Sequence, residues 1–130
     1  MRQDNLTACL STFFEANADI QLAILFGSVA MQSERPDSDI DIAVLGERPL
    51  DAAEKTALID AIAQMSGRPV DLIDLRTAGE PLLGEILRGQ RLKGSDGAYA
   101  NLLSRHLIDA ADFGPLQQRL LKERRDAWIH

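Results

Sequence analysis

The 130-residue sequence has one cysteine, one tryptophan and one tyrosine, and acidic residues outnumber basic ones. A single cysteine, Cys9, forms neither an internal disulfide nor a zinc-binding cluster. Cys9 shares a helical face with Leu6 and Phe13, and this spacing predicts a buried thiol. A chain of this length buries enough apolar surface to fold as one domain without such cross-links.

Long apolar runs are also missing. No stretch approaches the roughly 20 apolar residues that a helix needs to cross a bilayer, and the first residues lack the basic and apolar regions of a secretory signal. We therefore expect a cytoplasmic protein with no membrane partner. Basic residues are scarce in residues 1–90, where seven stand against fifteen acidic ones. This balance disfavours direct nucleic-acid binding, because affinity for phosphate backbones comes from clustered cations.

The apolar periodicity predicts an α/β (α+β) fold in which three strands alternate with helices. We expect helices over 5–17, 51–65, 81–88 and from 97 onward, and strands over 20–26, 39–45 and 70–75. A short helix is expected at 28–32, and a helix break at Gly114-Pro115. The apolar face of the helix after 97 is predicted to include Leu102, Leu103 and Leu107. One domain over 1–130 follows, with a core at about 5–90 and C-terminal helices at about 97–128.

The first candidate for chemistry is the turn after the first strand. Gly27 ends that strand, and a glycine lets another group approach the backbone closely. Ser28 then adds a hydroxyl at the N-terminus of the short helix, a position that suits a phosphate group. Turns of this kind are common, so this one favours phosphate binding only together with the acids that follow.

Asp39 and Asp41 are the second candidate. Alternation along the strand places both on one face, while the opposite face is fully apolar. Their Cα atoms are expected about 6–7 Å apart, so the carboxylates can converge on one or two Mg²⁺ ions. Burying two like charges side by side is costly without a cation. An ordinary solvent-exposed strand face is the alternative interpretation.

The third strand adds Asp71 and Asp74, which fall on opposite faces because their separation is odd. Only one of them can join the other acids. We favour Asp71, nearer the start of the strand, and predict that Asp74 is a surface or capping carboxylate. Metal-bound carboxylates stabilise charge on the attacking and leaving oxygens when a nucleophile attacks an α-phosphate. One carboxylate can accept the proton of the acceptor.

Gly27-Ser28, ten intervening residues and then Asp39-x-Asp41 resemble the signature of the nucleotidyltransferase superfamily that includes DNA polymerase beta. The small size and the Arg-Pro-Asp-Ser-Asp run at 35–39 are similar to its minimal nucleotidyltransferase (MNT) branch. The resemblance covers roughly residues 20–90. It implies a single nucleotidyltransferase domain with a small mixed three- to four-stranded sheet flanked by helices. It also implies Asp39, Asp41 and Asp71 as catalytic metal ligands, and Gly27, Ser28 and Ser38 as nucleotide contacts.

Minimal members of this superfamily often act as antitoxins paired with a HEPN-domain ribonuclease toxin. The resemblance therefore implies ATP and two Mg²⁺ ions as substrate and cofactor, and transfer of AMP to a tyrosine of such a toxin. Two alternatives stay open. Transfer to a small molecule such as an aminoglycoside usually involves a larger C-terminal domain than 97–130 provides. A non-catalytic, toxin-binding antitoxin is suggested by Met31-Gln32, which stand where many relatives have Arg-Gly.

Overall fold

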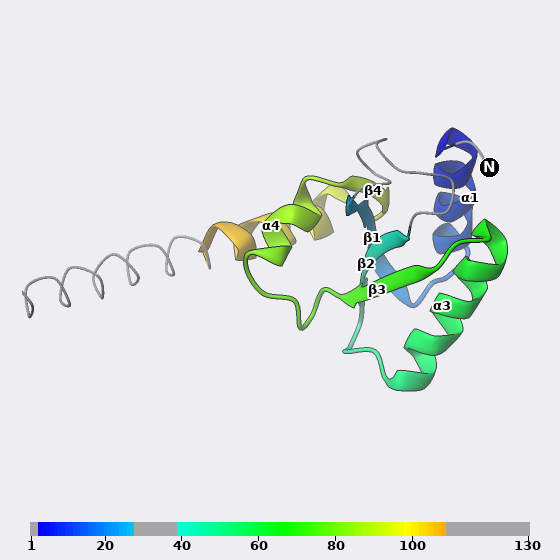
Figure 1. Ribbon diagram of the computed structural model, residues 1–130. Helices are drawn as coiled ribbons and strands as arrows, with labels where there is room; N and C mark the ends of the chain where they lie inside the picture. Colours follow the sequence, from blue (N-terminus) through cyan, green and yellow to red (C-terminus); the bar gives the residue numbers. More distant parts are fainter. Residues whose placement is uncertain (1–2, 28–38, 109–130) are drawn as a thin grey trace, which may run out of the picture.

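The computed structural model describes residues 3–27 and 39–108 of the chain (Figure 1). The elements, in chain order, are α1 (Gln3–Glu15), β1 (Ile20–Phe26), β2 (Ile40–Gly46), α3 (Ala52–Ser66), β3 (Val70–Asp74), α4 (Leu82–Leu87) and β4 (Gln90–Lys93). Helical residues 96–108 follow β4. The predictions at 28–32, at Ser38 and beyond 108 lie outside the described residues.

The four strands form one mixed sheet in the order β3-β2-β1-β4. β1 pairs antiparallel with both β2 and β4, whereas β2 and β3 run parallel. The expected fold class is therefore confirmed. β4 was not among the three predicted strands, because only Leu92 of its four residues is buried and so short a segment shows no apolar alternation.

One face of the sheet packs against α1 and α3 (Figure 1). β2 contributes the apolar side chains that alternation predicted for this face, and β1 adds Leu25. The helices contribute side chains three or four residues apart, as predicted, but Cys9 is only half-buried. The main buried members of this layer are Leu6, Leu10, Phe14, Leu25, Ile40, Ile42, Val44, Leu58 and Ile62.

The other face packs against α4 and the helical residues 96–108. Leu83 and Ile86 of α4 are fully buried against β1. Tyr99 donates a hydrogen bond from its hydroxyl to the Leu87 carbonyl at 3.0 Å, which ties the last described helix to α4. The predicted inner face of that helix is only partly right. Leu102 is buried, but Leu103 is 38% and Leu107 59% exposed.

Both ends of α3 are marked by capping residues, and its C-terminal end leads directly into β3. Asp51 caps the N-terminus as predicted, because its side chain accepts from the Glu54 amide at 2.7 Å and the Glu54 side chain accepts from the Asp51 amide. Gly67 ends the helix in a left-handed conformation with φ of 70°. The chain then turns directly into β3 beside β2. Within residues 3–27 and 39–108, no helix is long and apolar enough to span a membrane.

Candidate active site

Asp41 and Asp71 occupy matching positions on neighbouring strands. In the parallel β2–β3 pair, Asp41 is the register partner of Asp71, so both side chains emerge on the same face of the sheet. Ala43, two residues after Asp41, packs in the layer beside α4, which identifies that face. The two acids therefore stand on the α4 side of the sheet, at the end where both strands begin.

The backbone of Gly27 lies directly against the Asp41 carboxylate. Phe26 is the register partner of Asp41 on β1, which brings the residue after β1 to the same end of the sheet. A Cβ atom at position 27 would lie 2.3 Å from Oδ2 and 3.2 Å from Cγ of Asp41. The φ angle of Gly27 is +77°, a conformation that other residues rarely adopt. Both space and backbone geometry therefore favour glycine next to this carboxylate.

Negative charge accumulates around Asp41. Partial burial raises the pKa of the Asp41 carboxyl above its ordinary value of 3.8, and the charges of Asp71, Asp39 and Glu85 raise it further. Glu85 belongs to α4 and was not predicted from the sequence, because only the packing of α4 on this face brings it near. A divalent cation would relieve this repulsion.

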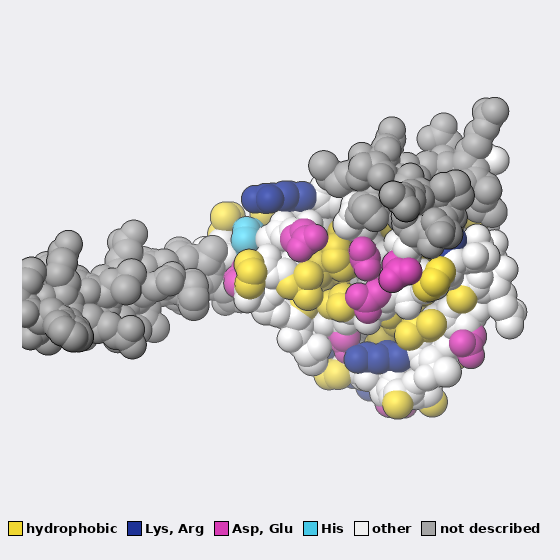
Figure 2. All heavy atoms as spheres, viewed as in Figure 1, with side chains coloured by type: hydrophobic (Ala, Val, Ile, Leu, Met, Phe, Trp, Pro, Cys, Tyr) yellow, Lys and Arg dark blue, Asp and Glu magenta, His cyan; other side chains and the backbone are white. Residues whose placement is uncertain are grey.

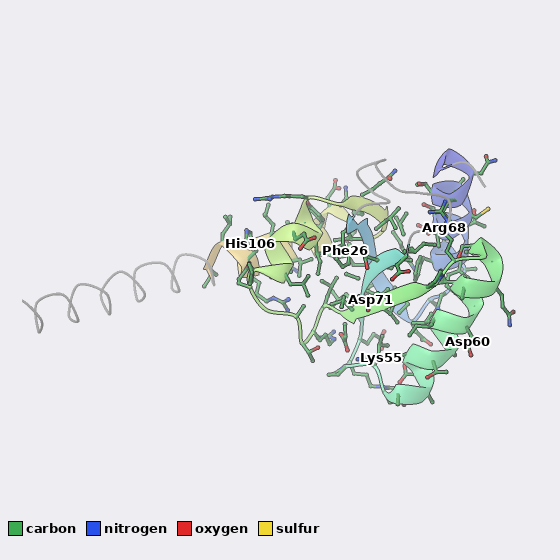
Figure 3. The ribbon with its side chains drawn as sticks, viewed as in Figure 1. Phe26, Lys55, Asp60, Arg68, Asp71 and His106 are labelled. Carbon is green, nitrogen blue, oxygen red and sulfur yellow. The ribbon has the colours of Figure 1, made fainter. Side chains whose placement is uncertain are left out.

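Asp39 immediately precedes β2 and is exposed, as is Asp71, while Asp41 is half-buried. Figure 2 shows acidic side chains gathered on this face of the molecule, and Figure 3 labels Asp71 on β3. Carboxylate oxygens are the donors that Mg²⁺ prefers. Within the described ranges, no three acidic, histidine or cysteine side chains are already drawn together at metal-binding distance. The donor type therefore suits Mg²⁺, and Asp39 and Asp71 are accessible from solvent, but the described acids do not form a preassembled ligand cluster.

Asp74, the other acid of β3, has a different role. It is buried, with only 4% of its surface exposed. Its carboxylate accepts from the Leu50 amide at 2.8 Å and the Arg76 amide at 2.9 Å, and so joins the loop before α3 to the turn after β3. Asp74 lies on the opposite face from Asp71, as predicted, but it is neither a surface carboxylate nor a helix cap, because it is buried and bonds to a loop amide and a turn amide.

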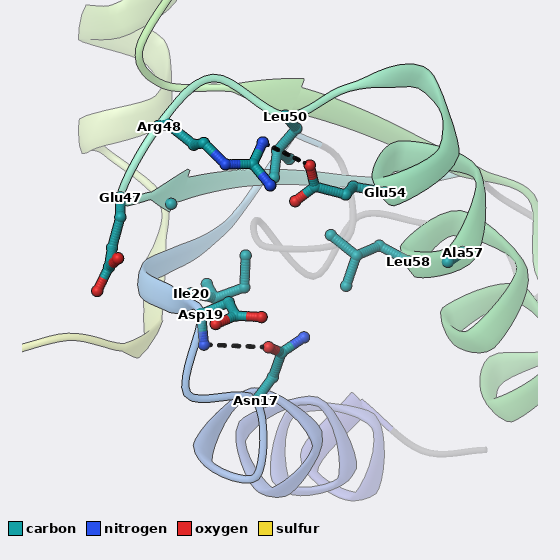
Figure 4. A pocket seen from close by; sticks show the side chains of 10 residues that line it. Asn17, Asp19, Ile20, Glu47, Arg48, Leu50, Glu54, Ala57 and Leu58 are labelled. Atoms are coloured by element: carbon teal, nitrogen blue, oxygen red, sulfur yellow. Dashed lines mark hydrogen bonds and ion pairs between the residues drawn. The ribbon is translucent and has the colours of Figure 1, made fainter.

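A cleft at the opposite end of β1 and β2 is separate from this site (Figure 4). Its walls include Asp19 before β1 and Gly46 at the end of β2. Arg48 and Glu54 form an ion pair of 2.7 Å there, and Arg48 is largely exposed. The cleft contains none of the acids near Gly27, so it does not contribute to the candidate active site.

The geometry agrees with what comparison with known proteins finds. The family model described as "Polymerase beta, Nucleotidyltransferase" matches residues 9–97. The chain belongs to this family. The nucleotidyltransferase is 33% identical, over 96 residues, to "Protein adenylyltransferase MntA" of Shewanella oneidensis, a match that spans 73% of this chain and 69% of the relative.

Solved structures agree with the family assignment. The nucleotidyltransferase superposes on a chain in the crystal structure of a toxin–antitoxin with AMP-PNP, with a TM-score of 0.76 and 25% identity over 93% of this chain and 98% of the other. A second match lies in the complex of a tri-AMPylated Shewanella oneidensis HEPN toxin with an MNT antitoxin. That match has a TM-score of 0.66 and 25% identity, and covers 92% of this chain and 99% of the other.

Proposed function

We propose that this nucleotidyltransferase is a Mg²⁺-dependent protein adenylyltransferase that transfers AMP from ATP to a tyrosine hydroxyl of a HEPN-family toxin, and thereby acts as its antitoxin. The observation that carries the proposal is that Asp41 pairs in register with Asp71 and that its carboxylate lies against the backbone of Gly27. This arrangement supplies carboxylates for a metal beside a turn that a phosphate group can approach. The relative MntA, named a protein adenylyltransferase, and the AMPylated toxin complex support the choice of reaction and acceptor.

The described residues have distinct parts in this reaction. Asp39, Asp41 and Asp71 would hold Mg²⁺, which supplies positive charge where the attacking and leaving oxygens become negative. The absence of a side chain at Gly27 lets the Asp41 carboxylate lie directly against its backbone, so that a metal-binding acid would stand beside the turn proposed to contact the phosphates. The acceptor hydroxyl oxygen forms a bond to the α-phosphorus, the bond from that phosphorus to the pyrophosphate oxygen breaks, and a carboxylate of the cluster accepts the hydroxyl proton.

Ser28 and Ser38 complete the proposed nucleotide site, although both lie outside the described residues. Ser28 would add its hydroxyl to the contacts of Gly27 with the phosphates, and Ser38 directly precedes the first metal-binding acid. Substitution of either serine by alanine is expected to weaken ATP binding with no change in the acids themselves.

The test is incubation of the purified chain with Mg²⁺, α-labelled ATP and a HEPN-family protein that co-purifies with the chain or is found in the neighbouring reading frame. Asp39→Asn and Asp71→Asn remove proposed ligands. Asp60→Asn, an exposed acid on α3, is the matched control. We expect label on the HEPN protein with the wild type and Asp60→Asn, and no label with the other two variants.

Other outcomes would redirect the proposal. A stable complex that carries no label would indicate a binding antitoxin without turnover, the alternative that Met31-Gln32 suggests. Label that appears only on an added hydroxylated small molecule would indicate a different acceptor. Equal labelling by Asp39→Asn and the wild type would overturn the assigned metal site.

A further inference from the structure

Arg68 is a buried cation whose guanidinium has no partner among residues 3–27 and 39–108. Only 8% of its surface is exposed, and its Nη1 atom is buried without any hydrogen-bond partner. A guanidinium carries five N–H donors, and its burial without an anion is costly. The other buried charged residue of the described chain, Asp74, is bonded to two backbone amides. Arg68 therefore has donors that no described part of the protein uses.

Arg68 lies at the same end of the sheet as the acids. It stands in the turn where α3 ends and β3 begins (Figure 3). The next residue, Pro69, accepts a hydrogen bond from the Ile40 amide at 2.8 Å, so this turn is joined to the backbone between Asp39 and Asp41. Three residues after Arg68 comes Asp71, the register partner of Asp41.

The backbone around Arg68 is held in place. The Arg68 amide donates to the Ser66 hydroxyl at 3.2 Å, and that hydroxyl donates to the Ile62 carbonyl at 2.8 Å. The Gly67 amide donates to Ala63 at 2.8 Å. These bonds fix the point at which the Arg68 side chain leaves the backbone, at the end of the sheet where β3 begins.

Neighbouring acids do not neutralise Arg68. The ion pairs among the described residues are Arg48–Glu54, Arg91–Asp96 and His106–Glu80, and none involves it. Asp39, Asp41 and Asp71 thus stay available for a metal while the cation stays available for an anion. The segment 28–38 contains a single basic residue, Arg35, so few cations stand near the Gly27 turn in sequence.

We propose that Arg68 is an anion-binding residue of the nucleotide site and that its guanidinium contacts a phosphate of the bound nucleoside triphosphate; this inference rests on the proposed function. A guanidinium matches phosphate oxygens with paired hydrogen bonds that an ammonium cannot reproduce. Binding of the nucleotide then supplies the anion that the buried guanidinium lacks.

The experiment titrates Mg²⁺–ATP into the full-length wild type and into Arg68→Met, Arg68→Lys and Arg48→Met by calorimetry, and records ligand-free melting curves of each. Methionine keeps the apolar length of the side chain without its charge. Arg48 is exposed at the opposite end of the sheet, so Arg48→Met is the matched control. We expect Arg68→Met to weaken ATP binding about ten- to a hundredfold, the effect of a hydrogen bond to a charged group. Arg68→Lys should show a smaller loss.

The ligand-free melting temperature separates binding from structure. Arg68→Met should melt at or above the wild-type temperature, because an unpaired buried charge has been removed. Wild-type ATP affinity in Arg68→Met would overturn the assignment, and so would a loss of affinity matched by loss of the fold in both Arg68 variants. A different outcome would contradict the proposed function alone. In that case the wild type would bind ATP and Arg68→Met would bind it more weakly, but the wild type would transfer no label to a HEPN protein.

Discussion

Substitution of Gly27 by alanine should damage both the fold and the metal site. A left-handed conformation costs a non-glycine residue about 1–2 kcal/mol, and Gly27 has a φ of +77°. The new Cβ would also lie 2.3 Å from Asp41 Oδ2. Moving that carboxylate off its preferred rotamer adds about 0.5–1.5 kcal/mol. We therefore expect the free energy of unfolding to fall by roughly 2–3 kcal/mol.

Alanine substitutions at two other glycines separate the cost of the backbone strain from the cost of the clash with Asp41. Gly67 has a φ of +70° but no heavy atom within 4 Å of a built Cβ, so Gly67→Ala introduces the backbone strain without the clash. Gly79 also has open space and no positive φ, so Gly79→Ala should change stability by less than about 0.5 kcal/mol. The free energy of unfolding is measured in urea for all three variants. The difference between Gly67→Ala and Gly79→Ala gives the cost of the backbone strain, and the difference between Gly27→Ala and Gly67→Ala gives the cost of the clash with Asp41.

Ligand binding provides the second measurement. The wild type, Gly67→Ala and Gly79→Ala should all gain melting temperature when Mg²⁺ and ATP are added together. Gly27→Ala should gain much less, because the displaced Asp41 carboxylate no longer faces the metal. If Gly27→Ala lost no more stability than Gly67→Ala and kept a full response to Mg²⁺–ATP, the placement of Gly27 against Asp41 would be refuted.

Further predictions concern the acids. Asp39→Asn and Asp41→Asn should each abolish transfer of label while circular dichroism stays unchanged; a lost fold would contradict a metal site. Asp41→Asn should raise the stability of the metal-free protein at neutral pH by no more than about 1 kcal/mol, because solvent screens this half-buried group. Since the folded-state pKa of Asp41 is raised above 3.8, the native state holds the proton more tightly than the unfolded chain. The stability of the metal-free protein should therefore fall as pH rises from about 4 through the raised pKa and then level off. Mg²⁺ affinity should rise over the same window, and Asp41→Asn should remove the stability change, which urea titrations at several pH values would detect. Asp74→Ala should lower the free energy of unfolding by about 2–4 kcal/mol, since it leaves the amides of Leu50 and Arg76 unpaired; a neutral effect in urea would contradict this role.

Much of the fold could be predicted from local pattern. β1 lies at the predicted residues 20–26, and α3 begins after its predicted cap, Asp51. These elements are long and periodic, and their ends carry strong signals. β4 could not be predicted, because its four residues become a strand only by pairing with β1. The C-terminal helix was predicted near its observed start, but Leu107 is exposed because the bonds of this helix to α4 and the 75–78 turn decide which side packs inward.

The candidate site also contains some residues that could be identified from the sequence and others that only the structure reveals. The spacing from Gly27 to Asp39 and Asp41 could be found in the sequence, because one turn and one strand hold all of these residues. The choice of Asp71 over Asp74 rested on weak local grounds. It is supported by the β2–β3 register and by the backbone bonds of Asp74. Glu85 and Arg68 could not have been found, since neither belongs to a local motif.

The sequence by itself therefore determined the first three strands, the main capped helix and the spacing of the central acids, because these depend on residues close along the chain. Only the tertiary structure decided that Asp41 faces Asp71, that Gly27 leaves room for the Asp41 carboxylate, and that Arg68 is buried without a partner. These features depend on which strands pair and on how α3 and α4 cover the sheet. Contacts between distant segments are set by packing and hydrogen bonding of the whole fold, which no local pattern encodes.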